Sequence, residues 1–172
     1  MMPRFLWNTQ TQTLILSLCL NLSFSLPLWA QAVPLPQPPG TVLVQQLLQD
    51  MQAGEPRTAR YGFPFWLDSR WIKDEQTLSA LFQEGAKQRP FPEVTHLRVE
   101  IHPLSTLEAK SPAAWERLSL KSEAEFLAKT RLALVFFEIK KHGELHREES
   151  WLLVQPTEGS EPLWKLVGLL ER

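Results

Sequence analysis

The sequence predicts an α+β domain in which two or three helices pack on a mainly antiparallel sheet of four strands. Two observations carry this prediction. Apolar residues recur at helical spacing from Val44 to Met51 and again around Leu78, all in the first half of the chain. Two long runs rich in β-branched and aromatic residues, 131–141 and 144–155, flank a His-Gly pair that is typical of a tight hairpin turn.

The first segment of the chain carries no charged residue from Phe5 to Gln49. A basic start at Arg4 runs into an apolar stretch, and a small-x-small site ending at Ala32 follows. This layout is typical of a secretory signal peptide. We therefore expect a signal peptide over residues 1–32, a Pro-rich linker over residues 33–40 and a single α+β domain over residues 41–172. The expected location is outside the cytoplasm, in a periplasm or in the medium.

Two other interpretations of this segment stay open. A transmembrane anchor needs roughly 20 predominantly apolar residues, whereas Ser17 and Pro27 interrupt the run here. A bacterial lipoprotein needs a small residue just before the lipidated cysteine, whereas Leu18 precedes Cys19. Cleavage near Ala32 is the preferred interpretation, and the mature chain is then expected to have no membrane span.

Composition excludes several classes of site. The single cysteine would leave with the signal peptide, which removes thiol nucleophiles, thiolate metal sites and disulfides from the mature chain. The 18 Lys and Arg residues are scattered among 19 Asp and Glu residues, so no basic stripe predicts a nucleic-acid partner. His142 and His146 have a metal-ligand spacing, but Gly143 places a turn between them. We expect no cofactor and no metal.

The elements are expected in the following order. Thr41 is a plausible N-cap for a first helix, which Gly54 ends. Residues 57–72 resist a regular helix, because a glycine and a proline lie among their aromatic side chains, and we expect a loop there. Asp74 can cap a second helix, which Gly85 stops.

The second half is expected to be mainly β-structure. Residues 96–102 alternate between charged or histidine side chains and apolar ones, which is the period of a half-buried strand. Residues 111–129 have a short helical pattern that opens at Ser111 and again at a capping box that begins with Ser122. Residues 163–171 are expected to form the last strand.

A two-residue loop between the two long runs fixes the pairing of the hairpin. It places Glu138 opposite Arg147 and Leu134 opposite Trp151, so that unlike charges and apolar side chains fall together. Both faces of these strands are apolar near their centres. Since helices of the chain can cover one face, we expect a second subunit to cover the other, as a homodimer through the sheet face.

The closing segment Leu163-Trp164-Lys165-Leu166 and the order of elements resemble the nuclear transport factor 2-like superfamily, the cone-shaped α+β fold shared with ketosteroid isomerases and many exported bacterial proteins. The resemblance covers residues 41–172 and implies a curved sheet, with Trp164 in the core and Lys165 pointing outward. The isomerase branch uses a carboxylate base and a tyrosine in an apolar pocket. Here the single tyrosine, Tyr61, falls in the expected loop, so no catalytic residue is assigned.

The candidate ligand-binding residues form two groups. An aromatic segment would line a mouth for an apolar or flat ligand, with a carboxylate as its polar anchor, unless it caps the end of the core. Near the hairpin end, a carboxylate beside aromatic surface can act as an acid or base, unless it belongs to a rim of cross-strand salt bridges. The first group is Tyr61, Phe65, Trp66, Asp68 and Trp71, and the second is Glu138, His146 and Glu148.

Three functions stay open. The favoured one is a non-enzymatic exported domain that binds a small apolar ligand or an envelope protein, because no nucleophile or metal signature is present. The alternative is an isomerase- or hydrolase-like enzyme whose carboxylate base (Glu138, Glu148 or Asp68) faces an apolar cone pocket. The third is a purely dimerising accessory of a larger complex. Carboxylates on the rim would favour the binding domain over the enzyme.

Overall fold

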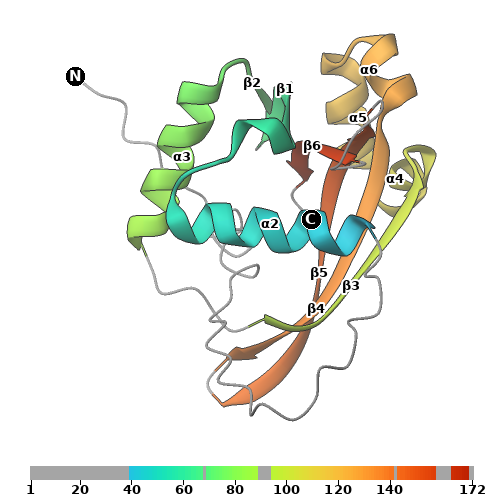
Figure 1. Cartoon of the computed structure of the whole chain (residues 1–172). Coiled ribbons are helices and arrows are strands. Elements are labelled where there is room, and N and C mark those ends of the chain that lie inside the picture. Colours follow the sequence, from blue (N-terminus) through green and yellow to red (C-terminus); the bar gives the residue numbers. More distant parts are fainter. Residues whose placement is uncertain (1–38, 68, 89–93, 142, 158–163, 171–172) are drawn as a thin grey trace.

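The structure is a computed structural model that describes residues 39–67, 69–88, 94–141, 143–157 and 164–170 (Figure 1). The predicted signal peptide, residues 1–32, and most of the predicted linker, residues 33–40, lie outside the described residues. Within the described part of the chain, no helix is both long enough and apolar enough to cross a membrane.

The described residues form an α+β fold with five α-helices and six strands, more of each than the sequence predicts. The helices are α2 (Pro39–Ala53), α3 (Glu75–Gln88), α4 (Ser105–Lys110), α5 (Pro112–Lys121) and α6 (Ala124–Lys129). The strands are β1 (Tyr61–Leu67), β2 (Arg70–Ile72), β3 (Val94–Pro103), β4 (Arg131–Lys141), β5 (Glu144–Pro156) and β6 (Trp164–Leu170).

The six strands make one mixed sheet in the order β2-β1-β6-β5-β4-β3. Strand β1 runs parallel to β6, and the other neighbouring strands are antiparallel. The predicted count of four strands is not confirmed, because the segment expected as a loop joins the sheet as β1 and β2. Its register against β6 shifts between Tyr61 and Trp66. This irregularity accommodates Pro64, which has no N–H to donate to a sheet ladder.

The hairpin of β4 and β5 has the predicted register. Glu138 pairs with Arg147, Leu134 pairs with Trp151, and Lys141 pairs with Glu144 on either side of the two-residue loop. Gly143 has a φ of 88°. This left-handed conformation is the one that glycine adopts at low cost in a two-residue hairpin loop.

Each face of the sheet is covered by helices of the same chain (Figure 1). Helix α2 crosses the long strands on one face and, together with α3, closes a first core; α4, α5 and α6 gather over one end of the other face and close a second core. Successive side chains of β4 enter the two cores alternately, as the apolar pattern on both faces predicts. A second subunit is therefore not needed to cover either face at these positions. The first core takes Ala133, Val135, Phe137, Ile139, Leu152 and Val154; the second takes Leu132, Leu134, Trp151 and Leu153.

The predicted helix ends are confirmed in part. Asp74 accepts a 2.8 Å hydrogen bond from the backbone N–H of Thr77 and so caps α3, but α3 continues past Gly85 to Gln88. Ser111 caps α5 through the N–H of Ala114. The capping box predicted at Ser122 is wrong, because its hydroxyl donates backward to the carbonyl of Leu118 and α6 has no side-chain cap. Helix α2 begins at Pro39, two residues before the predicted start.

Candidate functional site

The structure divides the predicted aromatic group between the two cores. Tyr61 and Phe65 are buried in the first core, whereas Trp66 is buried in the second core and Trp71 packs against it. Asp68, the predicted polar anchor, lies outside the described residues. Because neighbouring positions on a strand point to opposite faces, the segment contributes to both cores and does not gather these rings around one mouth.

Trp66 and Trp71 in the second core connect strands β1 and β2 to helices α5 and α6. The Trp71 ring meets Trp66 edge-on at a centroid distance of 4.9 Å and meets Phe126 of α6 at 4.8 Å. Its Nε1–H donates a 2.6 Å hydrogen bond to the carbonyl of Lys121 at the end of α5, and the Lys121 ammonium donates to the carbonyl of Ser69. These contacts give Trp71 a structural role as a clamp.

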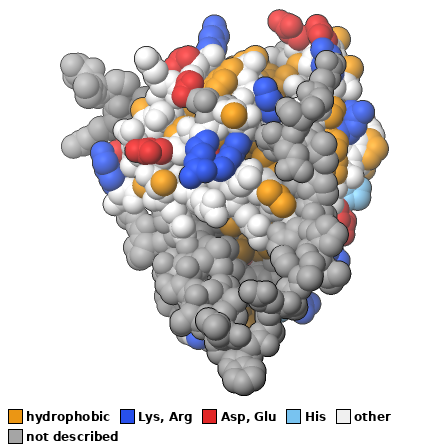
Figure 2. Space-filling model, in the orientation of Figure 1, with side chains coloured by type: hydrophobic (Ala, Val, Ile, Leu, Met, Phe, Trp, Pro, Cys, Tyr) orange, Lys and Arg blue, Asp and Glu red, His pale blue; other side chains and the backbone are white. Residues whose placement is uncertain are grey.

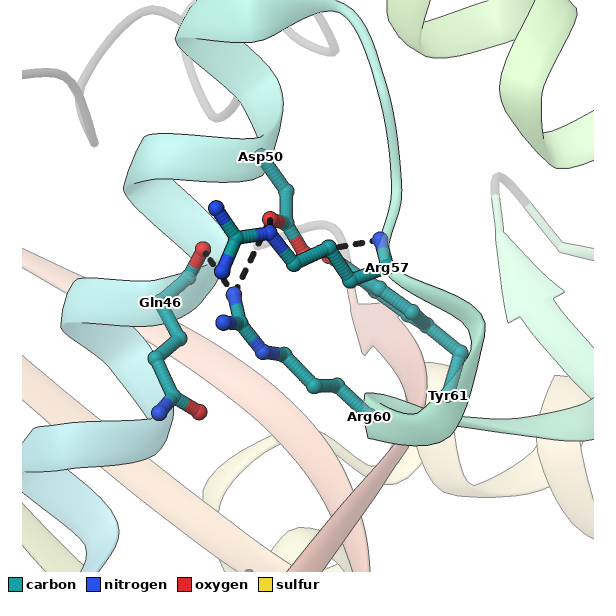
Figure 3. A network of polar contacts seen from close by, with 5 residues as sticks. All are labelled: Gln46, Asp50, Arg57, Arg60 and Tyr61. Carbon is teal, nitrogen blue, oxygen red and sulfur yellow. Dashed lines mark hydrogen bonds and ion pairs between the residues drawn. The ribbon is translucent and has the colours of Figure 1, made fainter.

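Asp50 on α2 is a buried carboxylate that the sequence analysis missed. Its side chain is 2 % exposed, and Asp50 is the one buried charged residue in the part of the chain that the structure describes. Its Oδ2 accepts hydrogen bonds from the Tyr61 hydroxyl at 2.9 Å and from the Arg57 backbone N–H at 3.1 Å (Figure 3). Its Oδ1 accepts one from Arg60 Nη1 at 3.0 Å, and the same Nη1 also donates to the Gln46 carbonyl (Figure 3).

This Asp50 network ties the end of α2 to the start of β1. Burial raises the pKa of the Tyr61 hydroxyl far above its ordinary value of 10.0, and the adjacent Asp50 charge raises it further. The hydroxyl therefore stays protonated and donates to Asp50. The Asp50 oxygens already accept hydrogen bonds from an arginine, a tyrosine and a backbone N–H. These bonds within the chain offset the cost of burying the charged carboxylate. The sequence signal for it was a lone carboxylate at the end of the apolar spacing of α2.

The hairpin group is also divided between the two faces of the sheet. Glu138 lies on the face of the second core, beyond the region that α4 covers. His146 is paired with Ile139, and Glu148 is paired with Phe137, so both lie on the face of the first core. Glu138 therefore cannot share a single site with His146 and Glu148.

Glu138 contacts a histidine and an arginine on the two neighbouring strands. Its Oε2 lies 2.8 Å from His96 Nδ1 on β3, and its Oε1 accepts a 3.1 Å hydrogen bond from Arg147 Nε on β5. The hydrogen bond from Arg147 is the main cause that holds the pKa of the Glu138 carboxyl below its ordinary value of 4.5, and the charge of a protonated His96 lowers it further. Glu138 is therefore an ionised, paired carboxylate at neutral pH.

Glu138 belongs to a larger polar surface on the outer side of β3, β4 and β5. The Arg98 guanidinium lies 4.7 Å from the centre of the Phe136 ring, a cation–π contact that holds both side chains in place. Glu149 accepts hydrogen bonds from Lys110 at 3.2 Å and from the Trp151 indole at 2.7 Å. We call this surface the outer polar face; its residues are His96, Arg98, Glu100, His102, Phe136, Glu138, Arg147 and Glu149.

The outer polar face carries both signs of charge in neighbouring positions. Glu100 Oε1 lies 3.4 Å from Arg98 Nη2, and its Oε2 lies 3.2 Å from His102 Nε2, so polar contacts run along β3 as well as across the sheet. The opposite side of the molecule, shown in Figure 2, also intersperses acidic and basic side chains without a broad patch of one sign among the described residues. Across the described ranges, no group of three His, Cys, Asp or Glu residues is placed to hold a metal ion.

We compared the chain with protein-family models, with curated proteins and with solved structures, and none of them matches it.

Proposed function

We propose that this chain is an exported, non-enzymatic domain that binds a protein partner across the outer polar face. Export rests on the N-terminal sequence pattern. The observation that carries the binding function is the Glu138 site, where a carboxylate, a histidine and an arginine from three adjacent strands form an exposed, pre-organised cluster. Pre-organised polar groups cost less entropy to bind a partner than free side chains do.

The state of the carboxylates favours binding over catalysis. A general base is most effective when its pKa lies near the working pH, whereas the pKa of Glu138 is shifted downward by its ion pairs. Asp50, the buried carboxylate, already accepts hydrogen bonds from Arg60, Tyr61 and a backbone N–H. Neither carboxylate is available as a base.

A protein partner fits the outer polar face better than a small apolar ligand does. The face combines an arginine stacked on Phe136 with acidic and basic side chains that form ion pairs. Arginine and aromatic residues are enriched in protein interfaces. A small apolar ligand would require the predicted aromatic mouth, whose rings belong to two separate cores. The mixed charge calls for a partner surface that also carries both signs.

We also propose that the chain belongs to an exported branch of the nuclear transport factor 2-like superfamily, with a cone-shaped fold. The position of α2 across the long strands supports this assignment (Figure 1). So does the last strand, in which Trp164 packs against the first core, Lys165 is exposed and Leu166 is buried, as the resemblance implies.

Site-specific photocrosslinking in cells that export the protein tests the binding function. Leu145 lies at the end of the outer polar face and is 65 % exposed, whereas Leu120 on α5 is 78 % exposed and serves as a matched control. A photoreactive residue at position 145 should capture a defined protein, and R147E should abolish the product. Equal capture from position 120, or a product that R147E does not affect, would refute the binding function.

The alternative is the isomerase- or hydrolase-like enzyme, and one observation favours it. Glu148 is half-buried on the face of the first core, opposite the buried Phe137. A carboxylate beside apolar surface is the environment in which such a base acts. Turnover of a carbonyl or ester substrate that is lost in E148Q and retained in E144Q would establish this alternative.

A further inference from the structure

Strand β3 forms one edge of the sheet as far as the structure describes it, since β4 is its one neighbour in the strand order. An edge strand presents a row of backbone N–H and C=O groups that can pair with another strand. Strand β3 runs from Val94 to Pro103, which is long for an edge, because typical strands have about five or six residues.

The sequence of β3 is nearly symmetric about Val99. Residues 96–102 read His-Leu-Arg-Val-Glu-Ile-His. On the outer polar face, Arg98 and Glu100 are equidistant from Val99 and have opposite charges, with a histidine beyond each. On the other face, the aliphatic Leu97 and Ile101 flank Val99, and all three are half-buried against the first core. A strand with this symmetry is complementary to a reversed copy of itself.

We propose that two copies of this chain pair antiparallel through their β3 edges, with the two-fold axis at Val99. In this register, Arg98 of each copy lies opposite Glu100 of the other, and Leu97 lies opposite Ile101. Cross-strand partners approach to about 5 Å between Cβ atoms, which is within reach of an ion pair. Such an interface is isologous, as in most dimers. The two sheets become continuous, and the two outer polar faces lie side by side.

The charges select this register over its neighbours. A register centred on position 98 places the two Arg98 side chains opposite each other, and one centred on position 100 does the same for the two Glu100 side chains. Like charges placed directly opposite each other in a sheet are destabilising. A shift of one strand by a single residue places outer polar side chains opposite apolar ones, because side chains alternate along a strand. Among these registers, the one centred on Val99 joins unlike charges on one face and aliphatic side chains on the other.

Contacts within the chain support the centre of β3, and irregular residues at both ends limit the length of strand that can pair. A Cβ at Gly40 would lie 2.8 Å from Val99 Cγ1, so the glycine lets α2 pack directly on the centre of the strand. At one end, the register against β4 shifts between Thr95 and Arg98, and His96 has a φ of 52°. At the other end, Pro103 lacks a donor. The regular part, Leu97 to His102, is the part that would pair.

Charge reversal and its rescue test this dimer by sedimentation equilibrium. The wild-type chain should form a dimer, and R98E and E100R should each weaken its dimerisation by about tenfold or more, since two attractive pairs become repulsive. The double variant R98E/E100R restores both pairs and should regain the wild-type affinity. R117E changes the same charge on the exposed face of α5 and should have no effect. A monomeric wild-type chain, or a double variant no tighter than the singles, would overturn the proposal.

Disulfide trapping gives a second test that does not alter any charge. In a Cys19→Ser background the introduced thiol is the only one in the chain. V99C lies on the two-fold axis, so it should form a cross-linked dimer on mild oxidation. H102C should not, because the two copies of position 102 are about 20 Å apart in this register. Absence of the V99C product, or equal cross-linking of H102C, would refute the β3 pairing whether or not the outer polar face binds another protein.

Discussion

The Tyr61 hydroxyl donates a 2.9 Å hydrogen bond to Asp50 Oδ2, which joins the first residue of β1 to the last turn of α2. Both residues are buried, at 4 % and 2 % exposure. The Tyr61 ring also meets Phe65 and Phe82 edge-on, so the hydroxyl is held in place by the packing of its ring in the first core. The sole tyrosine of the chain therefore has a structural partner.

Removal of the Tyr61 hydroxyl should destabilise the fold without changing it. Tyr61→Phe leaves Asp50 Oδ2 with one donor fewer, which should lower the free energy of unfolding by about 1–2 kcal/mol. Asp50→Ala should cost about 3 kcal/mol or more, because it leaves the nearly buried Arg60 charge unpaired. Urea unfolding followed by tryptophan fluorescence measures both. Leu145→Ala, at an exposed position, is the control, and equal stability of Tyr61→Phe and wild type would contradict this role.

Stability should also depend on Tyr61 in alkaline solution. Because the folded state raises the pKa of this hydroxyl, its contribution to stability is complete below the ordinary pKa of 10.0 and is lost as the pH rises above it. The wild-type chain should lose more stability than Tyr61→Phe over this range, and tyrosinate absorbance should appear only on unfolding. Tyrosinate absorbance in the folded protein near pH 10 would show that the hydroxyl is exposed to solvent.

Whereas Tyr61 loses its contribution to stability in alkaline solution, the Glu138 carboxylate should contribute to stability at neutral pH and lose this contribution in acid. Its folded-state pKa is lowered by Arg147 and His96, so its contribution to stability is present above the ordinary value of 4.5 and is lost as the pH falls through the lowered value. The stability difference between wild type and Glu138→Gln should therefore shrink on acidification. Glu144→Gln, at the end of the same hairpin, is the control. A difference that stays constant from neutral pH to pH 3 would contradict the pairing.

The clamp at Trp71 should stabilise the attachment of α5 and α6. Trp71→Phe retains an aromatic ring but removes the 2.6 Å hydrogen bond to the Lys121 carbonyl, which should cost about 1 kcal/mol. Trp71→Ala also removes the contacts with Trp66 and Phe126 and should cost about 3 kcal/mol. Hydrogen exchange should then be faster in α5 and α6 than in β4. Unchanged exchange in these helices would show that other contacts hold them.

Two glycines should respond to alanine substitution for different reasons. A Cβ at Gly168 would lie 2.7 Å from Trp66 Cβ and 2.8 Å from its carbonyl oxygen, so Gly168→Ala should cost about 1–3 kcal/mol by overpacking. Gly143→Ala meets no atom within 4 Å but has a positive φ of 88°, which should cost about 1 kcal/mol. Thermal unfolding separates the two, and a larger loss for Gly143→Ala would contradict the assignment.

The sequence by itself determined the local pairings of this protein. The His-Gly loop fixed the β4–β5 register, because a two-residue turn leaves one alignment of its flanking strands. Alternation along β4 correctly predicted two apolar faces, and Asp74 and Ser111 were identifiable as caps because they lie within one turn of the N–H groups they bind.

Only the tertiary structure decided how distant segments meet. Residues 61–67 became strand β1 because β6, about a hundred residues later, offered them a parallel edge, and no local pattern reports such a partner. The same pairing placed Tyr61 against Asp50 and separated Phe65 from Trp66. The order of the described strands places β3 at an edge of the sheet, where the symmetry about Val99 bears on the proposed pairing. Contacts between residues near in sequence depend on local geometry, whereas these contacts depend on how whole layers pack.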